Sequence, residues 1–214
     1  MRILTIPVKS LDRSKSRLGR VCSPLERGAL TLAMFEDVLD AALEVRGWEI
    51  WVVSPDEVVL EVASRRGVRP LPEAKPTLLG AIGQADEEAT ERAADALAVL
   101  LADTPLITTE VLSQSLNTLG PVVLAPSDDH GGTNLMVRRP PRAIRPRFGS
   151  DSFEKHRAEA VAKQLPVSVV ERPELAFDLD APDDILALLD ADHPGRIRNV
   201  CLELELESRI RVRA

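Results

Sequence analysis

The sequence is poor in aromatic residues and in cysteine. Aromatic side chains make up only 3% of the 214 residues, and tyrosine is absent. Leucine, valine, alanine and isoleucine must therefore form the core. The two cysteines, Cys22 and Cys201, are too few for a disulfide framework and do not form a C-x-x-C pair. These absences favour a soluble protein of the cytoplasm.

Long apolar runs are missing as well. No run of 18 or more apolar residues occurs, which argues against a membrane-spanning helix. The first ten residues, MRILTIPVKS, lack the charged and apolar regions of a secretory signal and are typical of a strand that enters a basic loop. An apolar content of 44% is too high for a disordered chain, and the length fits one globular domain.

Several motifs of nucleotide and acyl chemistry are absent. The sequence contains no G-x-x-x-x-G-K-[ST] loop, no G-x-G-x-x-G fingerprint and no G-x-S-x-G elbow. The three histidines, His130, His156 and His193, have no metal-binding spacing with one another or with the cysteines. We therefore interpret the histidines as incidental to the chemistry.

The charge is distributed unevenly along the chain. A net charge of −7 argues against general nucleic-acid binding. Residues 2–20 nevertheless hold six Lys and Arg residues against one acid, and residues 138–157 hold seven against two. Two basic segments in an acidic chain indicate a local pocket for a polyanion, although each is also compatible with an ordinary solvated surface.

Short apolar segments alternate with helical patterns over the first 190 residues. The patterns predict strands at 2–8, 48–53, 68–71, 96–101, 122–125, 135–137 and 167–170. They predict helices at 24–47, 55–66, 80–94, 110–115, 152–164 and 183–189. This alternation indicates an α/β fold, in which one mostly parallel sheet lies between two layers of helices.

The C-terminal residues follow a different pattern. Val200, Leu202, Leu204 and Leu206 alternate with polar residues, and a period of two is typical of a half-buried strand. We therefore predict a domain over residues 1–190 and a C-terminal β-arm over residues 191–214. An amphipathic strand beyond the last helix of a domain favours pairing with a second subunit, and hence a homodimer.

Charged side chains gather where predicted strands end, which is where open α/β sheets bind ligands. The loop after the first strand carries Lys9, Lys15 and Arg17, which can neutralise a triphosphate during phosphoryl or nucleotidyl transfer. The alternative is a solvated basic loop. The motif lacks the glycines of the better-known phosphate loops, so it is a weak signal when taken alone.

Three aspartates are candidates for a metal site. Asp103 ends the most apolar strand, where a carboxylate is costly without a partner. Asp178 and Asp180 are two residues apart, so in a strand both side chains face one side and repel each other unless a cation lies between them. A site with oxygen ligands alone suits Mg²⁺. Helix capping is the alternative role for Asp103 and for Asp180, which precedes the last predicted helix.

A second group of candidates surrounds two glycine-containing loops. Thr133 and Asn134 follow two glycines in the loop SDDHGGTN, so their backbone N–H groups can approach a phosphate closely. Gly149 and Ser152 open a helix whose N-terminus attracts anions, and Arg147 just upstream can pair with a carboxylate or a phosphate. An N-capped helix after an exposed loop is the structural alternative.

Five motifs in a fixed order carry a family resemblance. They are IPVKSLDRSKSRL, LLADTPLI, GGTNLM, RFGSDSFEKH and FDLDAPDDI. In this combination the sequence resembles the 2-phospho-L-lactate guanylyltransferases of coenzyme F420 biosynthesis, whose bacterial relatives prefer phosphoenolpyruvate. The resemblance spans roughly residues 1–190. It implies a Rossmann-like three-layer sandwich of the nucleotide-diphospho-sugar transferase type, and transfer of GMP from GTP to a three-carbon phospho-acid with release of pyrophosphate.

The resemblance also implies roles for individual residues. By position, Asp103, Asp178 and Asp180 would hold Mg²⁺, Thr133, Gly149 and Ser152 would bind the phospho-acid, and Lys9, Lys15 and Arg17 would meet the GTP phosphates. The chain departs from the family pattern at Thr77-Leu78-Leu79, where many members have Gly-Leu-Asn, and at Asp103-Thr104-Pro105, where Asp-Leu-Pro is usual. The first departure leaves guanine selectivity open.

Two other functions compete with this one. Another nucleotidyltransferase of the same fold, acting on a sugar phosphate or a molybdenum cofactor, would be expected to carry a glycine-rich loop that is missing here. A nucleotide-binding regulator without turnover would not need all three carboxylates. The sequence does not distinguish phospholactate from phosphoenolpyruvate as the acceptor.

Overall fold

The computed structural model describes residues 1–128, 131–191 and 193–213. Asp129 and His130, in the glycine-containing loop considered above, lie outside the described residues, as does Ala214 at the end of the predicted arm. Among the described helices, none has both the length and the apolar character needed to cross a bilayer.

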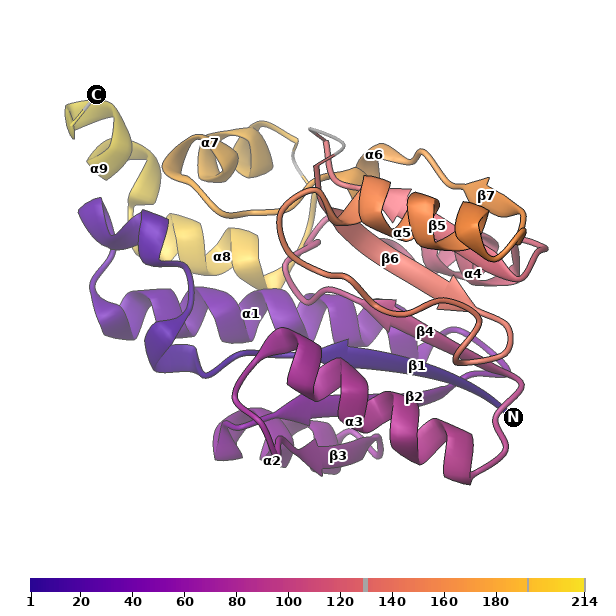
Figure 1. Ribbon diagram of the computed structural model, residues 1–214. Helices are drawn as coiled ribbons and strands as arrows, with labels where there is room; N and C mark the ends of the chain where they lie inside the picture. Colours follow the sequence, from indigo (N-terminus) through magenta and orange to yellow (C-terminus); the bar gives the residue numbers. More distant parts are fainter. Residues whose placement is uncertain (129–130, 192, 214) are drawn as a thin grey trace.

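The described part of the chain forms a mixed sheet in the order β3-β2-β1-β4-β6-β5-β7 (Figure 1). The strands are β1 (Arg2–Pro7), β2 (Glu49–Ser54), β3 (Arg69–Pro72), β4 (Ala96–Leu100), β5 (Val122–Pro126), β6 (Thr133–Arg138) and β7 (Val167–Val169). Strand β6 runs antiparallel to both of its neighbours, and every other pair is parallel. The predicted strands and the mostly parallel sheet are confirmed.

Helices cover both faces of the sheet. The helices are α1 (Pro24–Leu43), α2 (Glu57–Arg65), α3 (Leu78–Glu91), α4 (Thr109–Asn117), α5 (Ser152–Ala162), α6 (Pro173–Ala176), α7 (Pro182–Asp190), α8 (Arg196–Glu203) and α9 (Leu206–Arg213). Side chains of α1, α2 and α4 share one buried cluster with the sheet, whereas α3 and α5 pack on its other face. The predicted three-layer sandwich is therefore confirmed.

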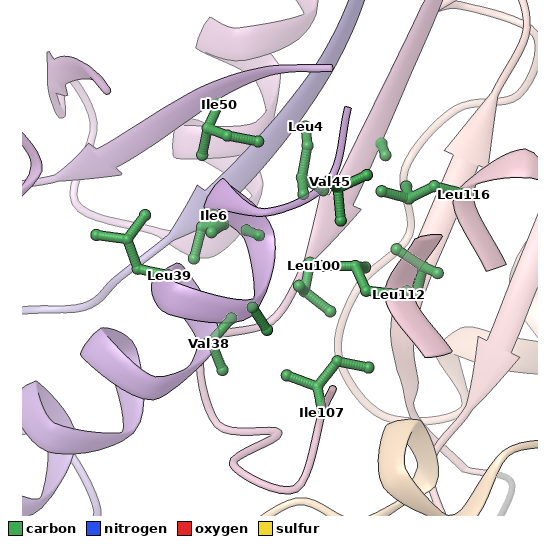
Figure 2. Packing of buried hydrophobic residues seen from close by; sticks show 14 of the residues in the cluster. Leu4, Ile6, Val38, Leu39, Val45, Ile50, Leu100, Ile107, Leu112 and Leu116 are labelled. Carbon is green, nitrogen blue, oxygen red and sulfur yellow. The ribbon is translucent and has the colours of Figure 1, made fainter. Parts of the chain in front are cut away.

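The larger core is aliphatic, as the lack of aromatic residues requires. Figure 2 shows side chains of one cluster that come from β1 (Leu4 and Ile6), from β4 (Leu100) and from α1 (Val38 and Leu39). All five side chains are fully buried. Burial of a side chain of this size stabilises the fold by about 1.5–3 kcal/mol. Helix α1 thus holds the central strands, whose ends carry the candidate site.

The start of α1 shows how local sequence fixes an element. Ser23 Oγ accepts a hydrogen bond from the backbone N–H of Glu26, and the Glu26 carboxylate accepts one from the Ser23 N–H. Pro24 occupies the first turn, where its missing N–H costs nothing. This reciprocal cap fixes where α1 begins, directly after the basic loop that follows β1.

The predicted C-terminal β-arm is wrong, because residues 196–203 and 206–213 form the helices α8 and α9. Ile197 and Cys201 are four residues apart and fully buried, whereas Leu202 is 52% exposed. Ile197, Val200 and Cys201 follow helical spacing. The alternation that begins at Val200 obscures this spacing in the sequence. Both helices pack into a second apolar cluster with the start of α1 and with α7. The expected subunit contact stays a prediction.

Candidate active site

A cavity of about 630 Å³ lies at the carboxyl ends of the parallel strands β3, β2, β1 and β4. Lys9, Lys15 and Arg17 line it from the loop after β1, and Asp103 lines it from the loop after β4. Asp180, far along the chain, completes this charged wall. Five of the predicted site residues therefore share one cavity. Asp178 and the predicted acceptor-binding residues lie outside its lining.

The loop after β1 is more ordered than a solvated basic loop. It forms two short 3₁₀ helices, η1 (Leu11–Arg13) and η2 (Ser16–Arg20). Ser14 between them is buried, and its hydroxyl hydrogen bonds with Thr31 of α1 at 2.6 Å. Lys15 adopts a left-handed backbone conformation with φ of +50°, which is uncommon for a residue with a side chain. The loop is thereby shaped to direct Lys15 inward.

The Lys15 ammonium joins two of the three aspartates. Its Nζ donates to Asp103 Oδ2 at 2.8 Å and to Asp180 Oδ1 at 2.7 Å, and the lysine side chain is only 7% exposed. Burial lowers the pKa of Lys15, but the two carboxylates outweigh it and raise that pKa above its usual value. Arg17 NH1 lies 3.9 Å from the second oxygen of Asp180 and is largely exposed. Lys15 thus forms the buried centre of the charged cluster.

Asp178 carries the strongest electrostatic strain in the cluster. Burial, together with the neighbouring carboxylates of Asp103 and Asp180, raises the pKa of Asp178 to about 6. A hydrogen bond from Asn134 and the charge of Lys15 oppose this increase without cancelling it. Three carboxylates therefore lie close to one buried ammonium, and the exposed cations of Lys9 and Arg17 add positive charge beside Asp180.

The segment that carries Asp178 and Asp180 is not a strand. It is held instead by the backbone N–H of Leu179, which donates to the carbonyl of Asp103 at 3.0 Å. Asp180 does not cap the next helix, because Ala181 occupies the N-cap position and Asp184 accepts the hydrogen bonds from both N–H groups of residues 180 and 181. The predicted capping role is wrong, and the Asp180 carboxylate is free to face Lys15.

The donor chemistry of the cluster fits a divalent metal ion. Asp103 Oδ1 is buried and accepts no hydrogen bond from the described residues. An unpartnered carboxylate oxygen beside a strained carboxyl is where a hard cation gains most. Among the described residues, however, no three His, Cys, Asp or Glu side chains are arranged to hold a metal directly. The ammonium of Lys15 lies between Asp103 and Asp180, so ligation by all three aspartates requires Lys15 to shift.

The second predicted group forms a separate, buried cluster beside the first. Thr133, at the start of β6, accepts a hydrogen bond from Ser152 Oγ at 3.2 Å and contacts His156 Nδ1 at 3.1 Å. The other ring nitrogen of His156 accepts the backbone N–H of Arg147 at 2.8 Å. Burial, then the charges of Arg138 and Arg147, lowers the pKa of His156 to about 4. The imidazole is therefore neutral and holds both segments in place.

The remaining predicted residues differ in their surroundings. Asn134 donates to the carbonyls of Leu175 and Ala176, at 2.9 and 3.1 Å, and so ties β6 to the segment that leads to Asp178. Gly149 is exposed and has φ of +122°, a conformation that residues with side chains rarely adopt. The Arg147 guanidinium is exposed and lies 3.3 Å from Glu159. The two clusters meet at the neighbouring residues Thr133 and Asn134.

Sequence reasoning missed two residues. His156, interpreted as incidental, is fully buried and connects Thr133 to the Arg147 backbone. The sequence could have indicated this role, because His156 follows Ser152 by one helical turn and both side chains then lie on one face of α5. Glu73 follows β3 directly and lines the cavity. Its placement at the carboxyl end of a parallel strand was the signal in that case.

Comparisons with known proteins agree with this geometry. The family model described as "Guanylyl transferase CofC like" matches residues 1–204. The chain is 39% identical over 186 residues to a phosphoenolpyruvate guanylyltransferase of Rubrobacter xylanophilus, which covers 86% of this chain and 91% of the relative. It is 36% identical over 201 residues to a 3-phospho-D-glycerate guanylyltransferase of Phenylobacterium zucineum, covering 90% of this chain and 91% of the relative.

Solved structures support the fold independently. A putative nucleotide-diphospho-sugar transferase from Desulfovibrio desulfuricans superposes with a TM-score of 0.81 at 17% identity, covering 99% of this chain and 98% of the other. A 4-diphosphocytidyl-2C-methyl-D-erythritol synthase superposes with a TM-score of 0.60 at 13% identity, covering 87% and 95%. The fold is thus that of the nucleotide-diphospho-sugar transferases, and the chain, a nucleotidyltransferase, belongs to the CofC-like guanylyl transferase family.

Proposed function

We propose that this chain transfers GMP from GTP to the phosphate of a three-carbon phospho-acid. A phosphate oxygen of the acid forms a bond to the α-phosphorus of GTP, and the bond from that phosphorus to the β-phosphate oxygen breaks. Pyrophosphate leaves with the bonding electrons, and the product joins the acid to GMP through a diphosphate. No general base is needed because the acceptor phosphate is already ionised at neutral pH.

The single observation that carries this proposal is the arrangement around Lys15. A buried ammonium, two further cationic side chains and two carboxylates line one end of a cavity large enough for a nucleotide, and the charge of the third carboxylate, Asp178, acts on the same cluster. Lys9, Lys15 and Arg17 suit the phosphates of GTP, because fixed cations stabilise the charge that develops on the leaving pyrophosphate. Family membership narrows this chemistry to guanylyl transfer.

We further propose that Asp103, Asp178 and Asp180 hold Mg²⁺ once GTP brings its own phosphate oxygens. Mg²⁺ is commonly bound through one or two carboxylates together with substrate phosphates, so it need not find all its ligands in the free protein. When bound, the ion neutralises charge on the transferring phosphoryl group. Lys15, released from the carboxylates, is then within reach of the phosphates.

The cluster around Thr133 is our candidate site for the acceptor. The Thr133 and Ser152 hydroxyls lie together, and the N-terminus of α5 adds backbone N–H groups that favour an anion. Arg147 and Gly149 lie on the approach to this helix, and Asn134 connects the cluster to Asp178. We propose phosphoenolpyruvate or 2-phospho-L-lactate as the acceptor, in a step of coenzyme F420 biosynthesis. The relative that acts on 3-phospho-D-glycerate makes that acid a necessary comparison.

The test is pyrophosphate release by the purified protein with MgCl₂ and GTP. Phosphoenolpyruvate, 2-phospho-L-lactate and 3-phospho-D-glycerate are offered in parallel, with glucose 1-phosphate as a sugar-phosphate control and with ATP and CTP in place of GTP. We expect release with GTP and at least one three-carbon acid. Release with the sugar phosphate alone would favour another nucleotidyltransferase, and no release with any acceptor would favour a nucleotide-binding regulator.

A further inference from the structure

The cavity has two chemically different ends. Asp103 and the cationic loop mark one end, above β4 and β1, and Glu73 marks the other, directly after β3. Neighbouring strands lie about 4.8 Å apart, so β3 and β4, three steps apart in the sheet, are separated by roughly 14 Å. An extended nucleoside triphosphate can bridge such a span. With its phosphates near Lys15, the base of the nucleotide reaches toward Glu73.

The backbone on both sides of Glu73 is fixed. The side-chain amide of Gln84 donates to the carbonyl of Pro72 at 3.0 Å and accepts the N–H of Ala74 at 3.0 Å. The N–H of Glu73 itself donates to the carbonyl of Ser54 at 2.9 Å. These three hydrogen bonds hold the residue without using its carboxylate. The half-buried carboxylate faces the backbone N–H of Thr77 and keeps further acceptor positions for a ligand.

The rest of this end of the cavity is mainly apolar. Pro55, Pro76 and Leu78 line it together with Thr77. Flat or aliphatic side chains of this kind suit the faces of a purine, and a small number of polar groups then sets its orientation. Among the described cavity-lining residues that follow β2 and β3, Glu73 is the one with an ionisable side chain. Burial raises the pKa of Glu73, and the Thr77 backbone N–H opposes that increase.

We propose that the Glu73 carboxylate recognises the Watson–Crick edge of guanine and so sets the base selectivity of this chain. The inference rests on the proposed function, in which GTP is the donor. A carboxylate only accepts hydrogen bonds, and guanine offers two adjacent donors, N1–H and the 2-amino group. The two oxygens of Glu73 can accept both in parallel.

The same arrangement disfavours binding of adenine and weakens binding of hypoxanthine. Adenine places the N1 lone pair against the carboxylate, so an acceptor would face an acceptor and the carboxylate would gain no hydrogen bond from the base. Hypoxanthine keeps N1–H but lacks the 2-amino group, so one of the two hydrogen bonds is lost. Selectivity therefore arises from the edge of the base and does not require a polar side chain at Leu79.

The test measures binding of GTP and of inosine triphosphate, in MgCl₂ and without an acceptor, by isothermal titration calorimetry. We expect the parent protein to bind GTP roughly tenfold to a hundredfold more tightly than inosine triphosphate. In Glu73→Gln the amide NH₂ opposes the 2-amino group, and in Glu73→Ala both acceptors are gone. In both variants the ratio of the two affinities falls toward one. Because no acceptor is present, this result is independent of whether the proposed transfer occurs.

Asp12→Asn is the matched control. Asp12 lines the same cavity from the loop after β1 and is largely exposed, so the substitution removes one negative charge from the cavity and leaves Glu73 in place. We expect the affinity ratio of this variant to equal that of the parent. Melting temperatures confirm that each variant is folded, and Glu73→Gln keeps the shape of the side chain if Glu73→Ala unfolds. A parent that binds both nucleotides alike, or Glu73 variants that keep the parental ratio, would overturn the proposal.

Discussion

Two ion clusters in this molecule have opposite designs. Arg138 of β6 is fully buried and donates to both oxygens of Asp86 in α3, at 2.6 and 2.9 Å. One cation meets one anion, and the pair is closed to solvent. Around Lys15, by contrast, one buried ammonium faces carboxylates that are 29% and 41% exposed, with Asp178 close by.

The difference separates a structural role from a functional one. The Arg138–Asp86 pair is balanced, so a further ion would gain nothing there. In the Lys15 cluster, one buried ammonium faces three carboxylates while Lys9 and Arg17 add positive charge from the exposed side; the pKa of Asp178 is raised, and one oxygen of Asp103 accepts no hydrogen bond from the described residues. Such a cluster is stabilised by a ligand that brings cations and phosphates together. Substitutions in each cluster, made separately, test this difference.

The largest expected effect is on catalysis, in Asp103→Asn. The substitution removes a carboxylate that we place at the metal, so turnover falls roughly a hundredfold to a thousandfold. The amide can still accept a hydrogen bond from Lys15, so the melting temperature changes little. Pyrophosphate release and a thermal melt measure the two effects. A variant with parental turnover would remove Asp103 from the catalytic machinery.

Asp86→Ala is the corresponding change at the balanced pair. It leaves Arg138 buried without its partner, and the free energy of unfolding falls by about 3–5 kcal/mol. Denaturant titration measures the loss. As a control, the double variant Asp86→Leu with Arg138→Met removes both charges and recovers much of the stability. A single variant as stable as the parent would show that the pair is not structurally important.

Lys15→Met tests how the Lys15 cluster depends on the buried ammonium at its centre. Without the ammonium, Asp103 and Asp180 repel each other, and the metal-free protein loses about 1–3 kcal/mol, less than a fully buried pair because both carboxylates are partly exposed. MgCl₂ should then raise the melting temperature of the variant more than that of the parent. Equal responses to MgCl₂ would argue that Lys15 does not compete with the ion.

The smallest expected effect is a pH dependence that arises at His156. The folded protein holds its pKa near 4, below the ordinary value of 6.5, so the unfolded chain binds more protons between these values. The contribution of His156 to stability is therefore complete above pH 6.5 and is lost as the pH falls toward 4. Denaturation of the parent and of His156→Gln at pH 5 and 7.5 measures it. The variant should lose less stability on acidification than the parent does.

The fold was predictable because its signals are local. Buried parallel strands appear as short apolar runs, and the Ser23 cap is complete within four residues. The prediction for residues 196–213 was wrong because the contacts that determine their secondary structure are not local. Ile197 and Cys201 face α1 and α7, which are distant in the sequence, and the αL residue Glu205 separates two short helices inside what looked like one alternating segment.

The residues of the candidate site could be predicted from their type and position, but the contacts between them could not. The positions of Asp103 and Lys15 at strand ends indicated that they share a site. The sequence gives no distance between them, so the ion pair in which Lys15 joins Asp103 to Asp180 appears only in three dimensions. The buried hydrogen bonds of His156 depend in the same way on how α5 packs against β6.

The reversed direction of β6 has a consequence for how the enzyme family diversifies. In the function proposed above, the donor nucleotide lies where β1, β3 and β4 end, whereas Thr133 lies where β6 begins. Under that proposal, the two substrates contact opposite ends of neighbouring strands, in segments joined to different loops. We therefore expect changes near Thr133 and α5 to alter the choice of acid without altering nucleotide binding, and relatives named for different acids are compatible with this separation.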